Sequence, residues 1–120
     1  MMQEREYAEF LDSMGLPEQP FSPSTPLCLV LNGELELTFE YNAQEDIVLS
    51  LASALPPYAH AKLEKALRAA SFYAKRELDF TAGYSRDRLL LLTLVPGDCT
   101  ASQLTETVAA LIRQYEHLEE

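Results

Sequence analysis

Histidines, cysteines and paired carboxylates are the side chains in this sequence that could carry chemistry. His60 and His117 are its two histidines, and neither has a cysteine, an aspartate or a second histidine at ligand spacing on the same predicted helix face. Glu64, four residues after His60, is the nearest candidate. A metal ion needs several ligands that converge on one point, so we interpret both histidines as ordinary surface residues and expect no metal site.

The cysteines and the acidic series lead to the same result. Cys28 and Cys99 lie far apart without a CxxC spacing, so we expect two small buried hydrophobic side chains. Glu34, Glu36 and Glu40 could be imagined as paired catalytic carboxylates, but acids at alternate positions usually form the solvated face of a strand. The sequence has no phosphate-binding or nucleophile motif, and we expect no cofactor and no enzymatic activity.

The composition narrows the classes of partner. A length of 120 residues with 48% hydrophobic content predicts one domain, residues 1–120. The net charge of −10 argues against nucleic acid and anionic membranes as partners, because both are bound through Lys and Arg. The charged start MMQEREY does not resemble a secretory signal, and no apolar run is long enough to span a bilayer, so we expect a cytoplasmic protein.

The chain begins with a predicted amphipathic helix followed by a Pro-rich linker. Tyr7, Phe10, Leu11 and Met14 share one face, and Gly15 is suited to end the helix. Four prolines then predict a linker over residues 17–26.

Three strand-like runs follow this linker. LCLVL and ELELTFEY flank Asn32-Gly33, which predicts a β-hairpin because both residues tolerate a positive φ. DIVLSLASAL supplies a third strand, although its Ala-rich end could also begin a helix. The short connections predict an antiparallel meander.

After Pro56-Pro57 comes a second predicted helix, and its charge is opposite to that of the preceding strands. Residues 56–76 hold five of the chain's nine Lys and Arg residues, whereas residues 26–55 hold acids and no Lys or Arg. The basic stretch is either a solvated face or a surface that pairs with acidic residues on another chain.

The last part of the chain predicts a second hairpin and a long helix. The strand RLLLLTLV is apolar at successive positions, so both of its faces need cover from helices, another subunit or a ligand chain. Thr100 and Gln103 then fit a capping box that starts the final helix. We therefore predict an α+β fold, α-β-β-β-α-β-β-α, with a twisted antiparallel sheet packed against helices.

This element order resembles that of the class I type III secretion chaperones of the Tir-chaperone type, which are small acidic bacterial dimers. The resemblance covers nearly the whole chain and is carried by KLEKALRAASFYAKRELDFTAGYSRDRLLLLTLV and by the C-terminal amphipathic helix. It implies a cytoplasmic chaperone that binds the N-terminal chaperone-binding segment of a secreted effector in extended form and keeps it soluble and competent for secretion.

The resemblance also implies two surfaces. A homodimer would form through residues 57–74 and 77–84, with interface candidates Phe72, Tyr73, Leu78, Phe80 and Tyr84. The effector would occupy apolar grooves of the first helix and the outer strands, with candidates Phe10, Met14, Leu27, Leu29 and Leu37.

Two alternatives stay open. The chain could be one subunit of a heterodimeric chaperone for a gatekeeper or needle component. It could also be a small-ligand-binding domain or enzyme that uses His60 or a tyrosine as its acid/base group.

Overall fold

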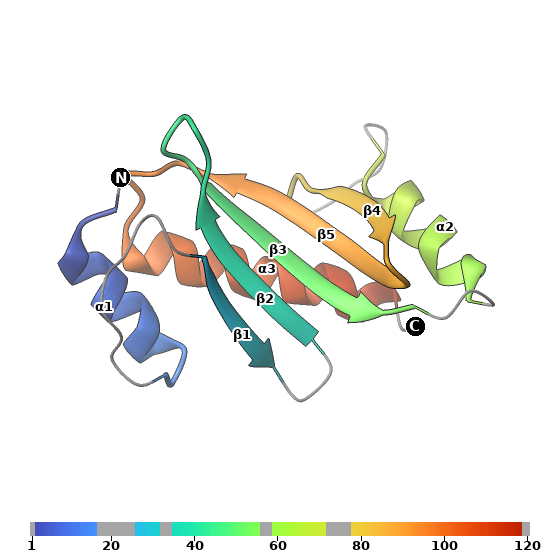
Figure 1. Cartoon of the computed structure of the whole chain (residues 1–120), viewed down its shortest axis with the longest axis horizontal. Helices are drawn as coiled ribbons and strands as arrows, with labels where there is room; N and C mark the ends of the chain where they lie inside the picture. Colours follow the sequence, from blue (N-terminus) through green and yellow to red (C-terminus); the bar gives the residue numbers. More distant parts are fainter. Residues whose placement is uncertain (1, 17–25, 32–34, 56–58, 72–77, 119–120) are drawn as a thin grey trace.

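The computed structural model describes residues 2–16, 26–31, 35–55, 59–71 and 78–118. The chain order confirms the predicted α-β-β-β-α-β-β-α fold (Figure 1). Its elements are α1 (Glu4–Ser13), β1 (Leu27–Leu31), β2 (Leu35–Tyr41), β3 (Ile47–Ala54), α2 (His60–Ala69), β4 (Thr81–Ser85), β5 (Arg88–Val95) and α3 (Ala101–Leu118).

The five strands form one antiparallel sheet in the order β1-β2-β3-β5-β4. The central pair, β3 and β5, runs in register from Ile47 opposite Val95 to Ala54 opposite Arg88. The Ala-rich end of the third predicted run is therefore strand, because it pairs with β5 along its whole length. β1 and β4 lie at the two edges of the sheet.

One face of the sheet carries the hydrophobic core. Leu37, Leu49 and Leu91 point to this face and are almost fully buried. α3 runs behind the sheet (Figure 1), and its core side chains include Leu104 and Leu111. α1 joins the same layer, where the ring of Phe10 stacks on Phe39 with 5.9 Å between centroids. The alternation of buried and outward residues follows from the two-residue period of a strand.

Local signals explain where two helices begin and end. Gly15 adopts a φ of 72°, the left-handed conformation that ends α1 as predicted. At the start of α3 the predicted capping box is present: the Gln103 N–H donates to Thr100 Oγ1 at 3.2 Å, and the Thr100 N–H donates to Gln103 Oε1 at 2.9 Å. The Ala101 N–H also donates to Glu6 Oε2 at 2.6 Å, which ties α1 to α3.

The second hairpin is shorter than the sequence predicted. β4 begins at Thr81, so Leu78 and Phe80 lead into the strand rather than belonging to it. The turn is made by Arg86 and Asp87, both with positive φ, as a tight two-residue hairpin requires. The predicted turn at Asn32-Gly33, most of the predicted linker and Pro56-Pro57 lie outside the described residues.

Candidate partner-binding surfaces

The face of the sheet opposite α1 and α3 is uncovered by any described helix (Figure 1). We call it the open face, and it consists of the side chains that alternate with those of the core. On β3 these side chains are small, with Ser50 and Ala52 at its centre. On β5 they are Leu90, Leu92 and Leu94. The open face therefore has a low centre along β3 and an apolar wall along β5.

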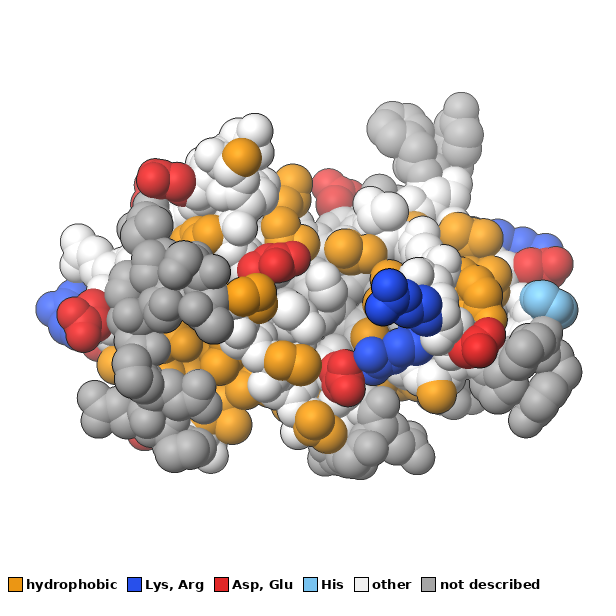
Figure 2. Space-filling view, viewed as in Figure 1, with side chains coloured by type: hydrophobic (Ala, Val, Ile, Leu, Met, Phe, Trp, Pro, Cys, Tyr) orange, Lys and Arg blue, Asp and Glu red, His pale blue; other side chains and the backbone are white. Residues whose placement is uncertain are grey.

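β2 forms the other wall of the open face, and this wall is polar. Thr38 lies opposite Ser50, and Glu36 lies opposite Ala52. Glu36 reaches across β3 to Arg88, with 2.8 Å between Oε2 and the guanidinium. Figure 2 shows hydrophobic side chains on this side of the molecule next to a basic pair and nearby acids. One wall thus suits apolar contacts and the other suits cationic ones.

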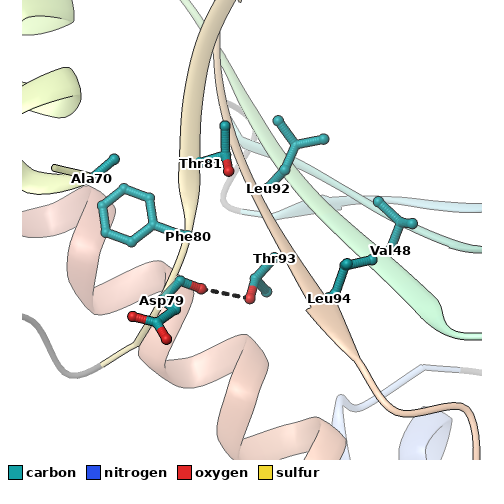
Figure 3. Close-up of a pocket in the computed structure, with 8 residues that line it drawn as sticks. All are labelled: Val48, Ala70, Asp79, Phe80, Thr81, Leu92, Thr93 and Leu94. Carbon is teal, nitrogen blue, oxygen red and sulfur yellow. Dashed lines mark hydrogen bonds between the residues drawn. The ribbon is translucent and has the colours of Figure 1, made fainter. Parts of the chain in front are cut away.

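A hollow of about 640 Å³, which we call the β5 hollow, lies beside the end of β5 that β4 does not reach. The last β4–β5 pair is Thr81 with Leu92, whereas β5 continues to Val95. Figure 3 shows the ring of Phe80 on the side of Ala70, with Val48, Leu92 and Leu94 grouped on the other side. The Thr93 hydroxyl donates to the Asp79 carbonyl at 2.8 Å, and this hydrogen bond attaches the chain just before β4 to β5. The hollow is mainly apolar, open and bounded by α2, β4 and β5.

The β1 edge is the second candidate surface. Val30 is 65% exposed and points to the open face, while Leu27 is half-buried against the core. Met14, just after α1, is also half-buried and packs against the core. Among the described residues β1 pairs with β2 alone, and no described strand lies along its other side.

The structure divides the five candidate effector-binding residues into two groups. Phe10, Leu29 and Leu37 are core residues, and the side chains of Phe10 and Leu37 are 0% exposed. Met14 and Leu27 are half-buried, and Leu27 is the first residue of the edge strand β1. The sequence could not separate these groups, because core and groove residues share the same apolar types.

The candidate dimer residues that the structure describes are Leu78, Phe80 and Tyr84, and of these only Phe80 lies at the β5 hollow. Phe80 lines the hollow, Leu78 is half-buried nearby in the chain, and Tyr84 is exposed on β4. The Tyr84 hydroxyl donates to Asp87 Oδ1 at 2.8 Å, and this hydrogen bond raises the pKa of Tyr84. Phe72 and Tyr73 lie outside the described residues.

Three exposed apolar residues were missing from the predicted sites. They are Val30, Leu94, which is 63% exposed, and Leu67 on α2, which is 50% exposed. For Leu94 the signal was present in the sequence, because a strand that is apolar on both faces needs cover on both. For Val30 and Leu67 no local signal distinguishes them from core residues.

The titratable groups converge on no catalytic constellation in the described part of the chain. His60 and His117 are exposed on different helices, and the described residues include no group of three His, Cys, Asp or Glu that could hold a metal ion. The prediction that both cysteines are buried is wrong for Cys28, which is exposed because even positions of β1 face outward. Cys99 is buried, and desolvation raises the pKa of its thiol.

No described helix is both long enough and apolar enough to cross a membrane.

Solved structures similar to this chain include type III secretion chaperones bound to protein partners. No protein-family model and no curated protein sequence matches the chain. The Yersinia pestis type III secretion chaperone SycH, solved with a stable fragment of YscM2, is 16% identical with a TM-score of 0.68, over 92% of this chain and 93% of that chain. The HopA1–SchA chaperone–effector complex matches with a TM-score of 0.68 at 12% identity, over 96% of this chain and 91% of that chain.

The fold of this chain is therefore that of the class I type III secretion chaperones, as the sequence resemblance implied. The same fold occurs in YbjN, a proposed transcription regulator from E. coli, with a TM-score of 0.59 at 16% identity, over 92% of this chain and 83% of that chain. Because the fold is shared by proteins to which different functions are given, the function has to be argued from the surfaces.

Proposed function

We propose that this chain is a cytoplasmic chaperone of a bacterial type III secretion system. It binds a secreted effector's N-terminal segment in extended form and keeps that segment soluble and competent for secretion. The observation that carries the proposal is the β1 edge, where no described strand pairs, with exposed Val30 toward the open face and half-buried Leu27 toward the core. The SchA–HopA1 pair, a chaperone–effector complex with this fold, supports it.

Strand addition explains how such an edge holds an unfolded segment. The backbone of the segment forms hydrogen bonds with the free side of β1, and its alternate side chains fall on the two faces of the sheet. On the core face they meet Leu27, and on the open face they meet Val30. Backbone pairing tolerates many sequences, whereas the apolar contacts select for alternating hydrophobic residues.

The binding energy must come from several apolar contacts, and no nucleotide is required. Each Leu or Phe of the segment that becomes fully buried contributes about 1.5–3 kcal/mol. Ordering the backbone opposes binding by about 1–2 kcal/mol per residue. A long segment with several apolar anchors is therefore a better client than a short peptide.

The chaperone is proposed to act as a homodimer that covers the β5 hollow. Leu92 and Leu94 are apolar and incompletely buried in the single chain, and α2 presents the exposed Leu67 beside basic residues. Arg68 of one copy is complementary in charge to the acidic β2 wall, Glu36 and Glu40, of the other. A second copy can satisfy both surfaces at once, because a two-fold interface uses each contact twice.

The charge of the protein affects how fast a client binds. A net charge of −10 attracts basic segments over long distances, and salt screens this attraction. We expect the association rate constant of a basic client segment, measured by stopped-flow fluorescence, to fall as salt rises from 50 mM to 500 mM. An association rate that is independent of salt would remove electrostatic steering from the proposal.

Light scattering after size exclusion tests the main proposal. The chain is measured alone and after co-expression with each secreted-protein gene encoded beside it. We expect a dimer that retains one neighbouring product. A chain that is insoluble alone but stable with a second small acidic protein would indicate a heterodimeric chaperone. A monomer that retains no neighbouring product contradicts the proposal.

A pair of matched variants locates the client on the chaperone. Val30→Lys places a charge at the exposed β1 position, and Ala43→Lys places the same charge on the exposed β2–β3 turn. We expect Val30→Lys to weaken binding of the retained client at least tenfold, and Ala43→Lys to leave it within twofold of wild type. Equal effects of the two variants would place the client elsewhere.

A further inference from the structure

Lys62 lies in the first turn of α2, where a positive charge is unfavourable. The helix dipole places partial positive charge at a helix start, and α2 has no acidic residue in its first turn and no side-chain N-cap. Lys62 Nζ instead donates to the hydroxyl of Tyr115 at 3.0 Å and lies 4.6 Å from the centre of its ring. Tyr115 of α3 thus offers this ammonium a hydrogen bond and a cation–π contact.

The hydrophobic attachment of α2 to the rest of the molecule is limited. Of the ten residues of α2 only Ala66 is fully buried, while Leu63 and Ala69 are half-buried against the core and Leu67 is 50% exposed. α2 contacts β4 along one side and α3 along another. α2 has fewer fully buried residues than α1 or α3, so a directional contact such as Lys62–Tyr115 carries more weight in fixing its tilt.

The other end of α2 forms part of the β5 hollow. Ala70 follows the last residue of α2 and lines the hollow with Phe80, Leu92 and Leu94 (Figure 3). Lys62 and Ala70 are separated by about 12 Å along the helix axis, from a rise of about 1.5 Å per residue. Because a helix moves as a rigid rod, a change of tilt at Lys62 displaces Ala70 and alters the shape of the hollow.

We infer that Lys62 and Tyr115 are positioning residues that set the tilt of α2 and thereby the shape of the β5 hollow. Neither side chain lines the hollow itself. The link from this pair to association rests on the proposed homodimer, whereas the link to the shape of the hollow does not.

Four variants of the full chain test this inference. Lys62→Met removes the ammonium and keeps an unbranched side chain, and Tyr115→Phe removes the hydroxyl and keeps the ring. Lys62→Arg restores a cationic donor over the ring. Lys65→Met is the control, because it removes one positive charge from an exposed position of the same helix.

The first readout is NMR of the Ala70 amide and the Leu92 and Leu94 methyl groups. We expect Lys62→Met to shift these resonances, Lys62→Arg to restore them, and Lys65→Met to leave them in place. Unchanged resonances in Lys62→Met, or equal shifts in Lys65→Met, would overturn the inference.

The second readout is the dimer dissociation constant, measured by sedimentation in 0.3 M salt, where exposed charges are screened. We expect Lys62→Met to raise it about tenfold and Tyr115→Phe about threefold, since the ring contact survives in the latter. The double variant should equal Lys62→Met, because Lys62→Met already removes the hydrogen bond that Tyr115→Phe removes. A Lys62→Met dimer as tight as wild type would overturn the inference.

Two further outcomes remain decisive. If Lys62→Met does not fold, Tyr115→Phe decides, and its failure to change either readout overturns the inference. If the wild-type chain is a monomer at every concentration, the proposed homodimer fails, while the NMR readout still decides whether Lys62 and Tyr115 position α2.

Discussion

The two faces of β5 carry the same kind of residue and have different environments. Leu89 and Leu91 point into the core and are almost fully buried, whereas Leu92 is half-buried and Leu94 is 63% exposed. The inner leucines are covered by α3, whereas no described helix lies over the face that carries the outer leucines (Figure 1). Residue type therefore predicts that a side chain needs to be buried, but it does not predict which part of the structure will bury it.

The two faces should therefore contribute to different equilibria. Burial of the inner leucines takes place on folding and stabilises the single chain. In the proposed dimer the outer leucines become further buried, so their hydrophobic energy contributes to association. Substitutions on the two faces can separate stability from binding.

The largest expected effect comes from Phe10, which the sequence placed in the effector groove and the structure places in the core. Phe10→Ala removes the stacking on Phe39 and leaves a cavity under α1, which should lower the free energy of unfolding by about 3–5 kcal/mol. Urea denaturation measures this loss. Weakened client binding with unchanged unfolding would show that Phe10 belongs to a groove rather than to the core.

Leu91 and Leu94 compare the two faces of β5 within one strand. Leu91→Ala should lower the free energy of unfolding by about 2–5 kcal/mol, because the residue is fully buried. Leu94→Ala should change it by less than about 0.5 kcal/mol but raise the dimer dissociation constant about tenfold. Urea denaturation at a concentration where both variants are monomeric separates the two terms. Equal losses of monomer stability would mean that the faces are equivalent.

A smaller effect is expected at the polar wall of the open face. Glu36→Gln breaks the ion pair with Arg88, and both side chains are more than one third exposed. Solvent screens such a pair, so the free energy of unfolding should fall by less than about 1 kcal/mol. Thermal unfolding at pH 7 measures the change, with Glu40→Gln on the same strand face as the control. A loss of several kcal/mol would show that the ion pair is part of the core.

The smallest effect is expected from pH, and it concerns titratable groups that folding buries. Burial raises the pKa of Tyr7, Tyr41 and Cys99 above their values in the unfolded chain. The unfolded chain therefore loses these protons at a lower pH than the folded chain does. The free energy of unfolding should then fall as the pH rises past 9.0, the ordinary thiol pKa. Thermal unfolding between pH 8 and pH 10.5 should show a falling midpoint. Cys99→Ala should reduce the slope near pH 9, and an unchanged slope would contradict the assignment.

Several features of the fold could be read from the sequence because they depend on neighbouring residues. The capping box of Thr100 and Gln103 and the positive φ of Gly15 are local requirements, and both were predicted. The start of β4 was placed too early, since residues 77–80 have the composition of a strand. Only the folded structure shows that Thr81, opposite Leu92, is the first residue of β4 to pair.

The candidate surfaces were less predictable than the fold. Phe10, Leu37, Met14 and Leu27 belong to the same apolar class, yet the first two are core residues and the other two reach the surface. Burial depends on which helices and strands pack together. Periodicity along one element predicts its apolar face, but it does not predict which other element packs on that face. The contact between Lys62 and Tyr115, on two different helices, has no signature in the sequence for the same reason.

The sequence by itself determined the number and order of the elements, the acidic character of the protein and the unusual apolarity of β5. These properties follow from composition and from periods of two and about 3.6 residues, which act within one element. The tertiary structure decided that α1 and α3 share one face of the sheet, that no described helix covers the opposite face and that β4 begins opposite Leu92, which leaves the β5 hollow. These properties depend on contacts between residues distant in the chain, whose pairing only the folded structure specifies.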